Sequence, residues 1–245
     1  MDSYIEKNKR EYNAKAQAWE NAVQTNAGHK YLEKPAMDNE LPESFSGKSV
    51  LCIGVGSGGE LKEILKRNPA RVVGIDISDE LLKIAASKYP SVEFKEMNMS
   101  DMDFPDATFD FIYSSLAFHY APDWDILLKE VGRVLKQGGT VLFSTHNPVY
   151  WGSKPTTGNH TNPRCITLTE HTATLPGDIE ITYYNHPSQA SIQEALEHAG
   201  FTVQSFFVPS VIDAETEGEE KEWYEELKQL NAKDPLFLVI QATKQ

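Results

Sequence analysis

Short apolar runs alternate along this chain with segments in which apolar residues recur at helical spacing. The first run, Val50 to Ile53, ends in the glycine-rich stretch 54–59, and a helical segment follows as far as Asn68-Pro69. Because strands and helices alternate, the pattern predicts a parallel sheet joined by right-handed crossovers. Further strands are predicted at residues 71–76, 92–96, 109–114 and 140–145. Helices are predicted after Ser78, whose side chain can cap the helix, and over 124–135.

The regular alternation lapses between His146 and Pro187. Residues 165–175 and 179–184 are rich in β-branched and aromatic side chains, and the Pro176-Gly177-Asp178 segment between them is typical of a hairpin turn. We therefore predict a small inserted cap over residues 147–187. The main fold is expected to resume with a helix over 188–199, a strand over 201–208 and a last strand over 235–243.

Two further segments have helical patterns. Residues 4–22 carry apolar side chains at helical spacing, which predicts an amphipathic helix that packs somewhere on the sheet. Residues 213–226 are strongly acidic and predict a solvated helix, with a specific docking role as the alternative.

Charge and composition exclude several classes of partner. Among 245 residues, 36 Asp and Glu outnumber 23 Lys and Arg, and the formal charge of −13 repels phosphate backbones and anionic lipids. We expect no nucleic-acid and no membrane partner. The N-terminus lacks the apolar core of a signal peptide and no apolar run approaches roughly 20 residues, so a cytoplasmic protein is expected. Cys52, in a predicted strand, and Cys165, in a loop region, suggest neither a disulfide nor a metal site.

The glycine-rich stretch is ambiguous by itself. Gly54, Gly56 and Gly59 satisfy the GxGxxG spacing of dinucleotide-binding proteins, whereas Gly54, Gly56 and Gly58 satisfy the GxGxG spacing of S-adenosylmethionine (SAM) binders. Both patterns place a tight turn and the free N–H groups of a helix N-terminus next to a bound ligand. Residues farther along the chain decide between them.

Several motifs in order resemble those of the class I SAM-dependent methyltransferases, particularly the small-molecule branch with a ubiquinone-biosynthesis-like core. The resemblance is strong over about residues 44–144 and rests on pattern alone elsewhere. It is carried by Val50 to Gly58, Val73 to Asp76, Asn98-Met99, the stretch Phe104-Pro105-Asp106-Ala107-Thr108-Phe109-Asp110, Ser114 to His119, and Glu130 to Gly139.

The resemblance implies SAM as cofactor and S-adenosylhomocysteine (SAH) as product. Asp76 ends the second strand, where its carboxylate can accept two hydrogen bonds from the ribose; the alternative is a charge at a helix N-terminus. Asn98 can bond the adenine amino group and Met99 can offer its backbone N–H, unless both only shape a loop. The cofactor-binding residues expected from the resemblance are Gly54, Gly56, Gly58, Asp76, Ile77, Asn98, Met99, Ser114 and Tyr12.

Three other features bear on the cofactor site. Tyr12 and Trp19 are candidates for a lid, because family members place an N-terminal helix over the cofactor, and residues 31–37 resemble a segment beside it. Cys52 stands where relatives often carry an acid that helps hold the SAM ammonium group. Asn98 stands where relatives often carry Asp, and it keeps the oxygen that an exocyclic amine requires.

Methyl transfer from a sulfonium is an in-line displacement that depends mainly on positioning and needs no metal. A base is required only where the acceptor must lose a proton. His119, His146 and His186 are catalytic candidates, although histidines at such places also bind substrate or hydrogen-bond a loop. Four aromatic residues either line an acceptor pocket or form the core of the cap: Tyr150, Trp151, Tyr183 and Tyr184.

The sequence therefore predicts an α/β protein with a Rossmann-like, mostly parallel sheet of seven strands, the last strand antiparallel, plus a small inserted cap. One methyltransferase domain is expected over 1–245, with N-terminal lid helices (1–43), a SAM-binding core (44–146), the cap (147–187) and the C-terminal part of the core (188–245). The predicted activity is methyl transfer to a small molecule by a monomer or homodimer. The alternatives are an NAD-dependent oxidoreductase and a non-catalytic SAM-binding protein.

Overall fold

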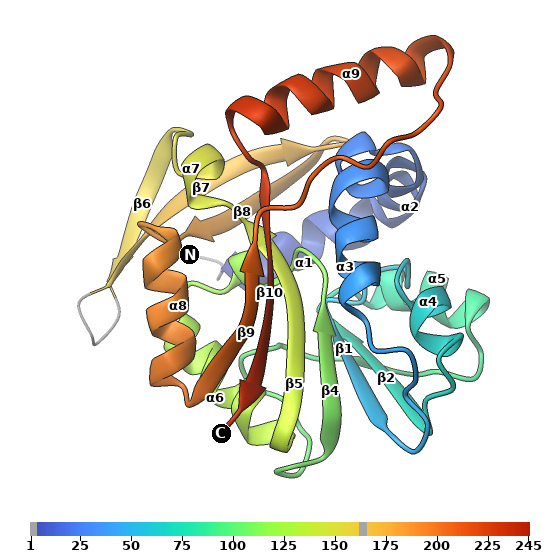
Figure 1. Cartoon of the computed structure of the whole chain (residues 1–245), viewed down its shortest axis with the longest axis vertical. Helices are drawn as coiled ribbons and strands as arrows, with labels where there is room; N and C mark the ends of the chain where they lie inside the picture. Colours follow the sequence, from blue (N-terminus) through green and yellow to red (C-terminus); the bar gives the residue numbers. More distant parts are fainter. Residues whose placement is uncertain (1–3, 162–165) are drawn as a thin grey trace.

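Seven strands form the central sheet of the computed structural model, which describes residues 4–161 and 166–245. Cys165 lies outside the described residues. The strand order is β3-β2-β1-β4-β5-β10-β9 (Figure 1). Strand β10 runs antiparallel to both of its neighbours and the pairs among the first five strands are parallel, as the sequence predicts. The strands are β1 (Ser49–Ile53), β2 (Arg71–Asp76), β3 (Glu93–Glu96), β4 (Phe109–Ser114), β5 (Leu135–His146), β9 (Phe201–Phe207) and β10 (Phe237–Lys244).

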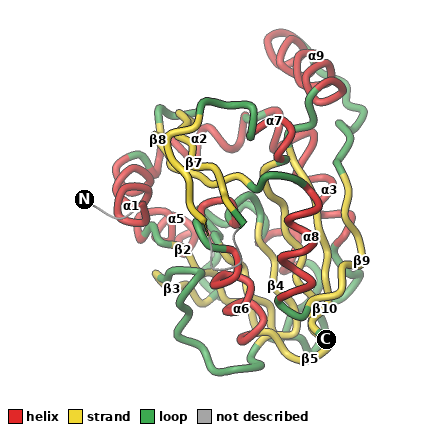
Figure 2. Tube along the Cα trace, turned by 90° about the vertical axis from the view of Figure 1, so that its left-hand side faces the viewer, coloured by secondary structure: helices red, strands yellow, loops and turns green. Residues whose placement is uncertain are grey.

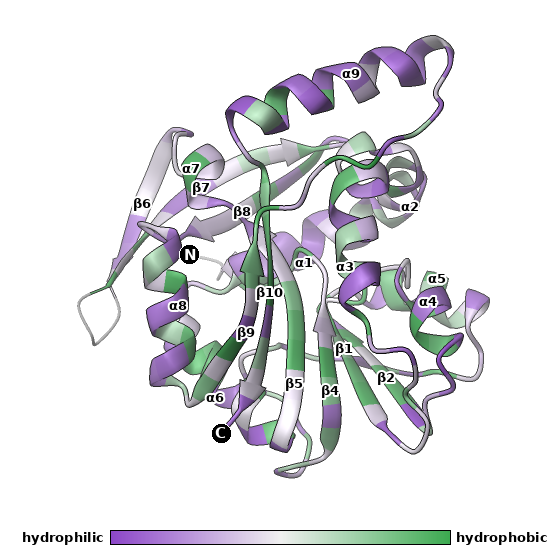
Figure 3. Ribbon diagram, viewed as in Figure 1, coloured by the Kyte–Doolittle hydropathy of each residue, from purple (hydrophilic) through white to green (hydrophobic). Residues whose placement is uncertain are grey.

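Helices cover both faces of this sheet, and side chains of β1 show how the two faces are separated. Leu51 and Ile53 belong to the cluster beneath α6 (Trp124–Val134) and α8 (Gln189–His198). Val50 and Cys52 point to the opposite face and join the cluster with α3 (Lys34–Glu40) and α4 (Leu61–Leu65). Because successive strand residues face opposite sides, a strand buried on both faces is apolar throughout. Figure 3 shows the central strands mostly in the hydrophobic colour.

The helices beside the parallel strands begin and end close to their predicted bounds. Helix α4 covers Leu61–Leu65, and α5 covers Asp79–Lys88. The Ser78 hydroxyl accepts a hydrogen bond from the backbone N–H of Leu81, so it caps α5 as the sequence predicts. A short 3-10 turn, η2 (Phe118–Tyr120), follows β4.

The cap is a separate three-stranded antiparallel sheet in the order β6-β7-β8. Strands β7 (Thr167–Leu175) and β8 (Ile179–Asn185) form the predicted hairpin, joined by a turn in which Gly177 and Asp178 have positive φ. Strand β6 (Thr156–Thr161) was not predicted, because its polar, largely exposed residues show no apolar alternation. The short helix α7 (Pro148–Trp151) joins β5 to the cap.

Two predicted helices have different bounds in the structure. The single helix expected over 4–22 is broken at Lys15 into α1 (Tyr4–Ala14) and α2 (Ala16–Thr25), which are followed by η1 (His29–Glu33) and α3 (Lys34–Glu40). The helix expected over 213–226 starts later and ends later, as α9 (Gly218–Lys233). The acidic run alone suggested that the helix ends at residue 226. Leu227 is buried, however, and extends the face by which the helix packs.

The N-terminal helices, the cap and α9 gather at one end of the main sheet in both views (Figures 1 and 2). The carboxyl ends of the parallel strands point to the same end (Figure 1). Helix α1 contacts β8 of the cap, and the Asn8 side chain bonds both the N–H and the C=O of Thr182, each at 2.9 Å. Within the described ranges, no helix is long and apolar enough to cross a bilayer.

Candidate functional site

A cavity of about 460 Å³ lies at the carboxyl ends of β1, β2, β4 and β5. Its wall also includes side chains from α1 and α2, from the β7–β8 turn and from α9. A volume of this size falls in the range of small-molecule and cofactor sites, and the edge of the sheet is where open α/β folds bind their ligands.

The glycine loop after β1 forms one wall of this cavity. Gly54 has φ +66° and a Cβ at this position would lie 2.4 Å from the Cβ of Ala117, so no larger residue fits without a shift. Gly56 also has positive φ and lines the cavity. Gly58, a predicted cofactor contact, does not line it; a Cβ there would press against Leu61 and Tyr89 instead. Its role in this structure is a turn.

Asp76 stands at the end of β2, beside the glycine loop. Its Oδ2 accepts the backbone N–H of Gly56 at 2.8 Å, and its Oδ1 accepts that of Ser78 at 2.9 Å. Burial raises the pKa of Asp76, while these bonds and one from Ile77 act in the opposite direction. The carboxylate still has lone-pair capacity left for a ligand hydroxyl, and Ile77 also lines the cavity.

Asn98 and Met99 line the cavity beyond β3. The Asn98 Oδ1 accepts the backbone N–H of Ser100 at 3.0 Å, which holds the side chain in place and leaves one lone pair. Ser114, by contrast, is fully buried and donates its hydroxyl to the Ile53 carbonyl at 3.0 Å. It does not line the cavity, whereas the next residue, Ser115, does.

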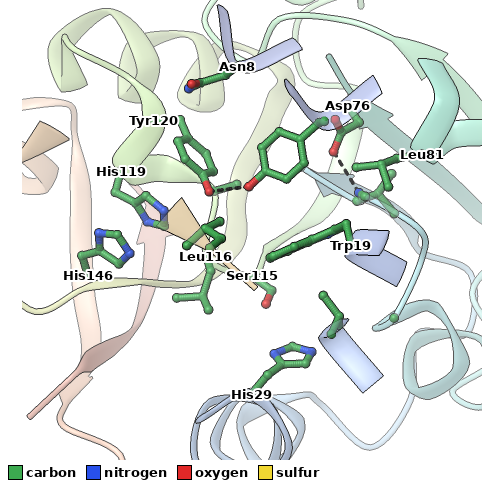
Figure 4. Close-up of a pocket in the computed structure, with 18 of the residues that line it drawn as sticks. Asn8, Trp19, His29, Asp76, Leu81, Ser115, Leu116, His119, Tyr120 and His146 are labelled. Atoms are coloured by element: carbon green, nitrogen blue, oxygen red, sulfur yellow. Dashed lines mark hydrogen bonds between the residues drawn. The ribbon is translucent and has the colours of Figure 1, made fainter. Parts of the chain in front are cut away.

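Tyr12 and Trp19 bring the N-terminal helices into the cavity wall. The Tyr12 and Tyr120 hydroxyls are 2.6 Å apart, and the Tyr12 ring meets Trp19 edge-on with centroids 5.5 Å apart. Burial raises the pKa of both tyrosines, so their hydroxyls stay protonated. Figure 4 shows Trp19 and the Tyr120 side chain projecting into the same space as Asp76.

His119 and His146 stack at another side of the cavity, with ring centroids 3.6 Å apart and planes 8° apart. Trp151 stacks on the far face of His146 at 3.9 Å. Burial lowers the pKa of His119 to about 3 and that of His146 well below its usual value, so both imidazoles are neutral near pH 7. The Nδ1 atoms of both are buried without a hydrogen-bond partner in the described structure.

His186, the third histidine candidate, is not in the cavity wall. Its Nδ1 lies 3.1 Å from the Ser191 hydroxyl, and its ring packs edge-on against Trp124 with centroids 4.4 Å apart. The structure therefore brings His119 and His146 together and leaves His186 in the packing around α8.

Sequence reasoning missed three ionisable residues in or behind the wall: His29, Glu33 and Glu60. Two features pointed to this segment: residues 31–37, which include Glu33, resemble a segment beside the cofactor, and His29 and Glu33 are four residues apart, the spacing of side-chain pairs on a helix. Cys52, at the position where an acid was discussed, is 0% exposed and faces the core away from the cavity. Across the part of the chain that the structure describes, no group of three His, Cys, Asp or Glu side chains could hold a metal ion.

Comparisons with known proteins agree with this geometry. A family model described as a methyltransferase domain matches residues 51–143. A crystal structure of a candidate SAM-dependent methyltransferase from Listeria monocytogenes superimposes with a TM-score of 0.70 and 27% identity, covering 87% of this chain and 96% of that one. An uncharacterised protein of Haemophilus influenzae is 27% identical over 226 residues, 85% of each chain.

A fatty-acid O-methyltransferase of Mycolicibacterium smegmatis is 32% identical over 107 residues, which are 42% of this chain and 39% of that protein. The match thus spans less than half of either protein. The family model over residues 51–143, the Listeria structure and the cavity agree with a SAM-dependent methyltransferase that uses SAM as cofactor.

Proposed function

We propose that this enzyme transfers the SAM methyl group directly to a small, neutral, largely apolar molecule. The observation that carries the proposal is one continuous cavity that has Asp76 and the glycine loop at one side and the His119–His146 stack at another. A sulfonium supplies a methyl group that is already electrophilic. The protein then contributes positioning, which is worth about 7 to 11 kcal/mol in well-oriented reactions.

The expected cofactor residues that line the cavity keep their roles under this proposal. Asp76 binds the ribose hydroxyls, Asn98 and the Met99 backbone bind the adenine, and Gly54 and Gly56 let the backbone approach closely. Tyr12 and Trp19 cover the site and exclude water. Because the wall is built from all four segments of the chain, for example by Tyr12, Asp76, Trp151 and Leu230, residues 1–245 work as one catalytic unit.

The acceptor end supports a neutral acceptor. Tyr150, Trp151, Leu227, Leu230 and Phe237 contribute to the wall there. None of the cavity-lining residues within the described ranges is Lys or Arg, and His119 and His146 are neutral, so a carboxylate or phosphate beside the histidine stack would find no positive charge there. A neutral imidazole can hydrogen-bond an acceptor O–H and take its proton once methylation turns that oxygen into a strongly acidic oxonium. His119 and His146 are proposed to do this.

Labelling with radioactive SAM tests the proposal. The enzyme is incubated with the ultrafiltrate of a cell extract or with the retained macromolecules, and Asp76→Ala serves as the inactive control. We expect label in the ultrafiltrate only. Label confined to macromolecules would contradict a small acceptor, and SAH binding without any transfer would indicate a binding protein.

A further inference from the structure

His29 carries a positive charge at the cavity because of a carboxylate buried behind it. The Nδ1 of His29 lies 2.9 Å from the Oε2 of Glu33, whose side chain is 0% exposed. The other oxygen, Oε1, accepts the hydroxyls of Ser115 at 2.8 Å and Ser144 at 2.5 Å. A buried carboxylate is costly unless it is paired and hydrogen-bonded, and here it is both.

This ion pair determines the protonation of both partners. Burial by itself would lower the pKa of His29, but the bond and charge of Glu33 reverse this and raise it. Burial would likewise raise the pKa of Glu33, yet His29, Ser144 and Ser115 bring it below its usual value. Both shifts favour the charged pair, with an imidazolium at His29 and a carboxylate at Glu33.

His29 is placed where a cation meets the ligand. It lines the cavity together with Gly56 and Ser57 of the glycine loop. In the view of Figure 4, His29 and Asp76 are at opposite sides of the cavity, with Trp19 between them. Because the wall has no Lys or Arg within the described residues, and His119 and His146 are neutral, His29 supplies its positive charge.

Glu60 places a carboxyl group on the same side of the cavity. It directly precedes α4, lines the cavity, and is electrostatically coupled to His29. Burial raises the pKa of Glu60 to about 7, so a cation that approaches it would favour the ionised form. Because Cys52 is packed in the core, position 52 offers no partner for the ammonium of SAM. Glu60, in contrast, lies at the cavity surface.

SAM and SAH end in an amino acid that carries one carboxylate and one ammonium group. With the ribose at Asp76, as proposed above, this end extends past the glycine loop. We propose that the imidazolium of His29, paired with Glu33, binds the α-carboxylate, and that the carboxylate of Glu60 binds the α-ammonium group. Glu33 is then a positioning residue, because it acts through His29.

The ionisable groups around this pair allow a definite pH dependence. Those facing His29 are Glu33, Glu60 and Lys34, and Lys34 is itself ion-paired with Asp38 at 3.0 Å. The charge of Glu60 also acts on three uncharged groups: Cys52, Tyr89 and Tyr113. Burial and this charge both raise their pKa values. SAH affinity should fall below about pH 7 as Glu60 takes a proton, and fall at higher pH as His29 loses one.

Calorimetry with two ligands tests the proposal. SAH carries the amino-acid end, whereas methylthioadenosine has the same nucleoside and sulfur with a methyl group in its place. His29→Ala should weaken SAH binding by about 10-fold or more, because one charge-assisted bond is lost, and should leave the affinity for methylthioadenosine unchanged. His198→Ala, on an exposed histidine of α8, is the matched control and should change neither.

The pH profiles separate binding from a structural role. His29→Lys should keep SAH affinity and shift its decrease to higher pH, while Glu60→Gln should remove the decrease on the acidic side. Glu33→Gln should move the alkaline decrease to lower pH. Titration of Asp76 changes the affinity of both ligands, so the methylthioadenosine profile serves to correct the SAH profile for it. Titration of the SAH ammonium group contributes equally to the profiles of all variants.

Two results would overturn the inference: an equal loss of both ligands in folded His29→Ala, or SAH profiles that His29→Lys and Glu60→Gln leave unchanged. Failure of both ligands to bind the wild-type protein would instead contradict the cofactor site on which the inference rests. Circular dichroism of each variant identifies those that have not folded.

Discussion

Asp76 combines two tasks that single substitutions can separate. Its oxygens hold the N–H groups of Gly56 and Ser78, and the same carboxylate is proposed to receive the ribose hydroxyls. Asp76→Asn keeps the size of the side chain but removes its charge, so SAH affinity should fall by about 10-fold or more with little change in fold. Asp76→Ala should add a loss of stability. Calorimetry and thermal melts give the two effects, and an unchanged dissociation constant in Asp76→Asn would remove the residue from the site.

At Cys52, introducing an acid should destabilise the protein and not improve cofactor binding. Because its side chain is fully buried and faces the core, Cys52→Asp should introduce an unpaired charge that lowers the free energy of unfolding by about 3 to 5 kcal/mol. No gain in SAM affinity is expected. The control is Cys52→Asn, which has the same shape without the charge and should cost less. Tighter SAM binding by Cys52→Asp in thermal melts with cofactor would contradict the core position.

At the scale of elements, α1 and α2 cover the cavity without belonging to the main sheet. Deleting residues 1–25 removes Tyr12 and Trp19 from the wall and admits water to the site, so the SAM dissociation constant should rise while the sheet remains folded. Asn8→Ala is a milder variant that removes only the two bonds of α1 to Thr182. Calorimetry with circular dichroism measures both effects. Equal affinity in the truncated protein would mean that these helices only pack on the cap.

At the scale of the whole molecule, the cavity and its surroundings determine the conditions for turnover. In-line methyl transfer relies on positioning, and no described group of side chains is arranged to hold a metal ion. We therefore expect EDTA to leave the transfer rate unchanged. A loss of rate that a divalent cation restores would contradict this expectation and indicate a metal-assisted reaction on the acceptor.

The local pattern was sufficient for most elements of the main sheet. Strands β2 and β4 have the predicted bounds, and Ser78 caps α5, because side-chain periodicity and capping act within a few residues. The break at Lys15, the polar strand β6, the true bounds of α9 and the start of β5 at Leu135 were missed. Each of these depends on packing against distant segments, which outweighs local propensity.

The site residues also divide into those that local sequence features indicate and those that only the tertiary structure brings together. The sequence by itself pointed to Gly54, Gly56 and Asp76, since a glycine turn and an acid at a strand end are local features that occupy the sheet edge in this fold. Only the tertiary structure could stack His119 on His146, place Glu33 behind His29, and turn Cys52, Gly58, Ser114 and His186 away from the cavity. These relations join residues far apart in the chain, and crossovers between strands, not spacing along the sequence, decide which side chains share one buried space.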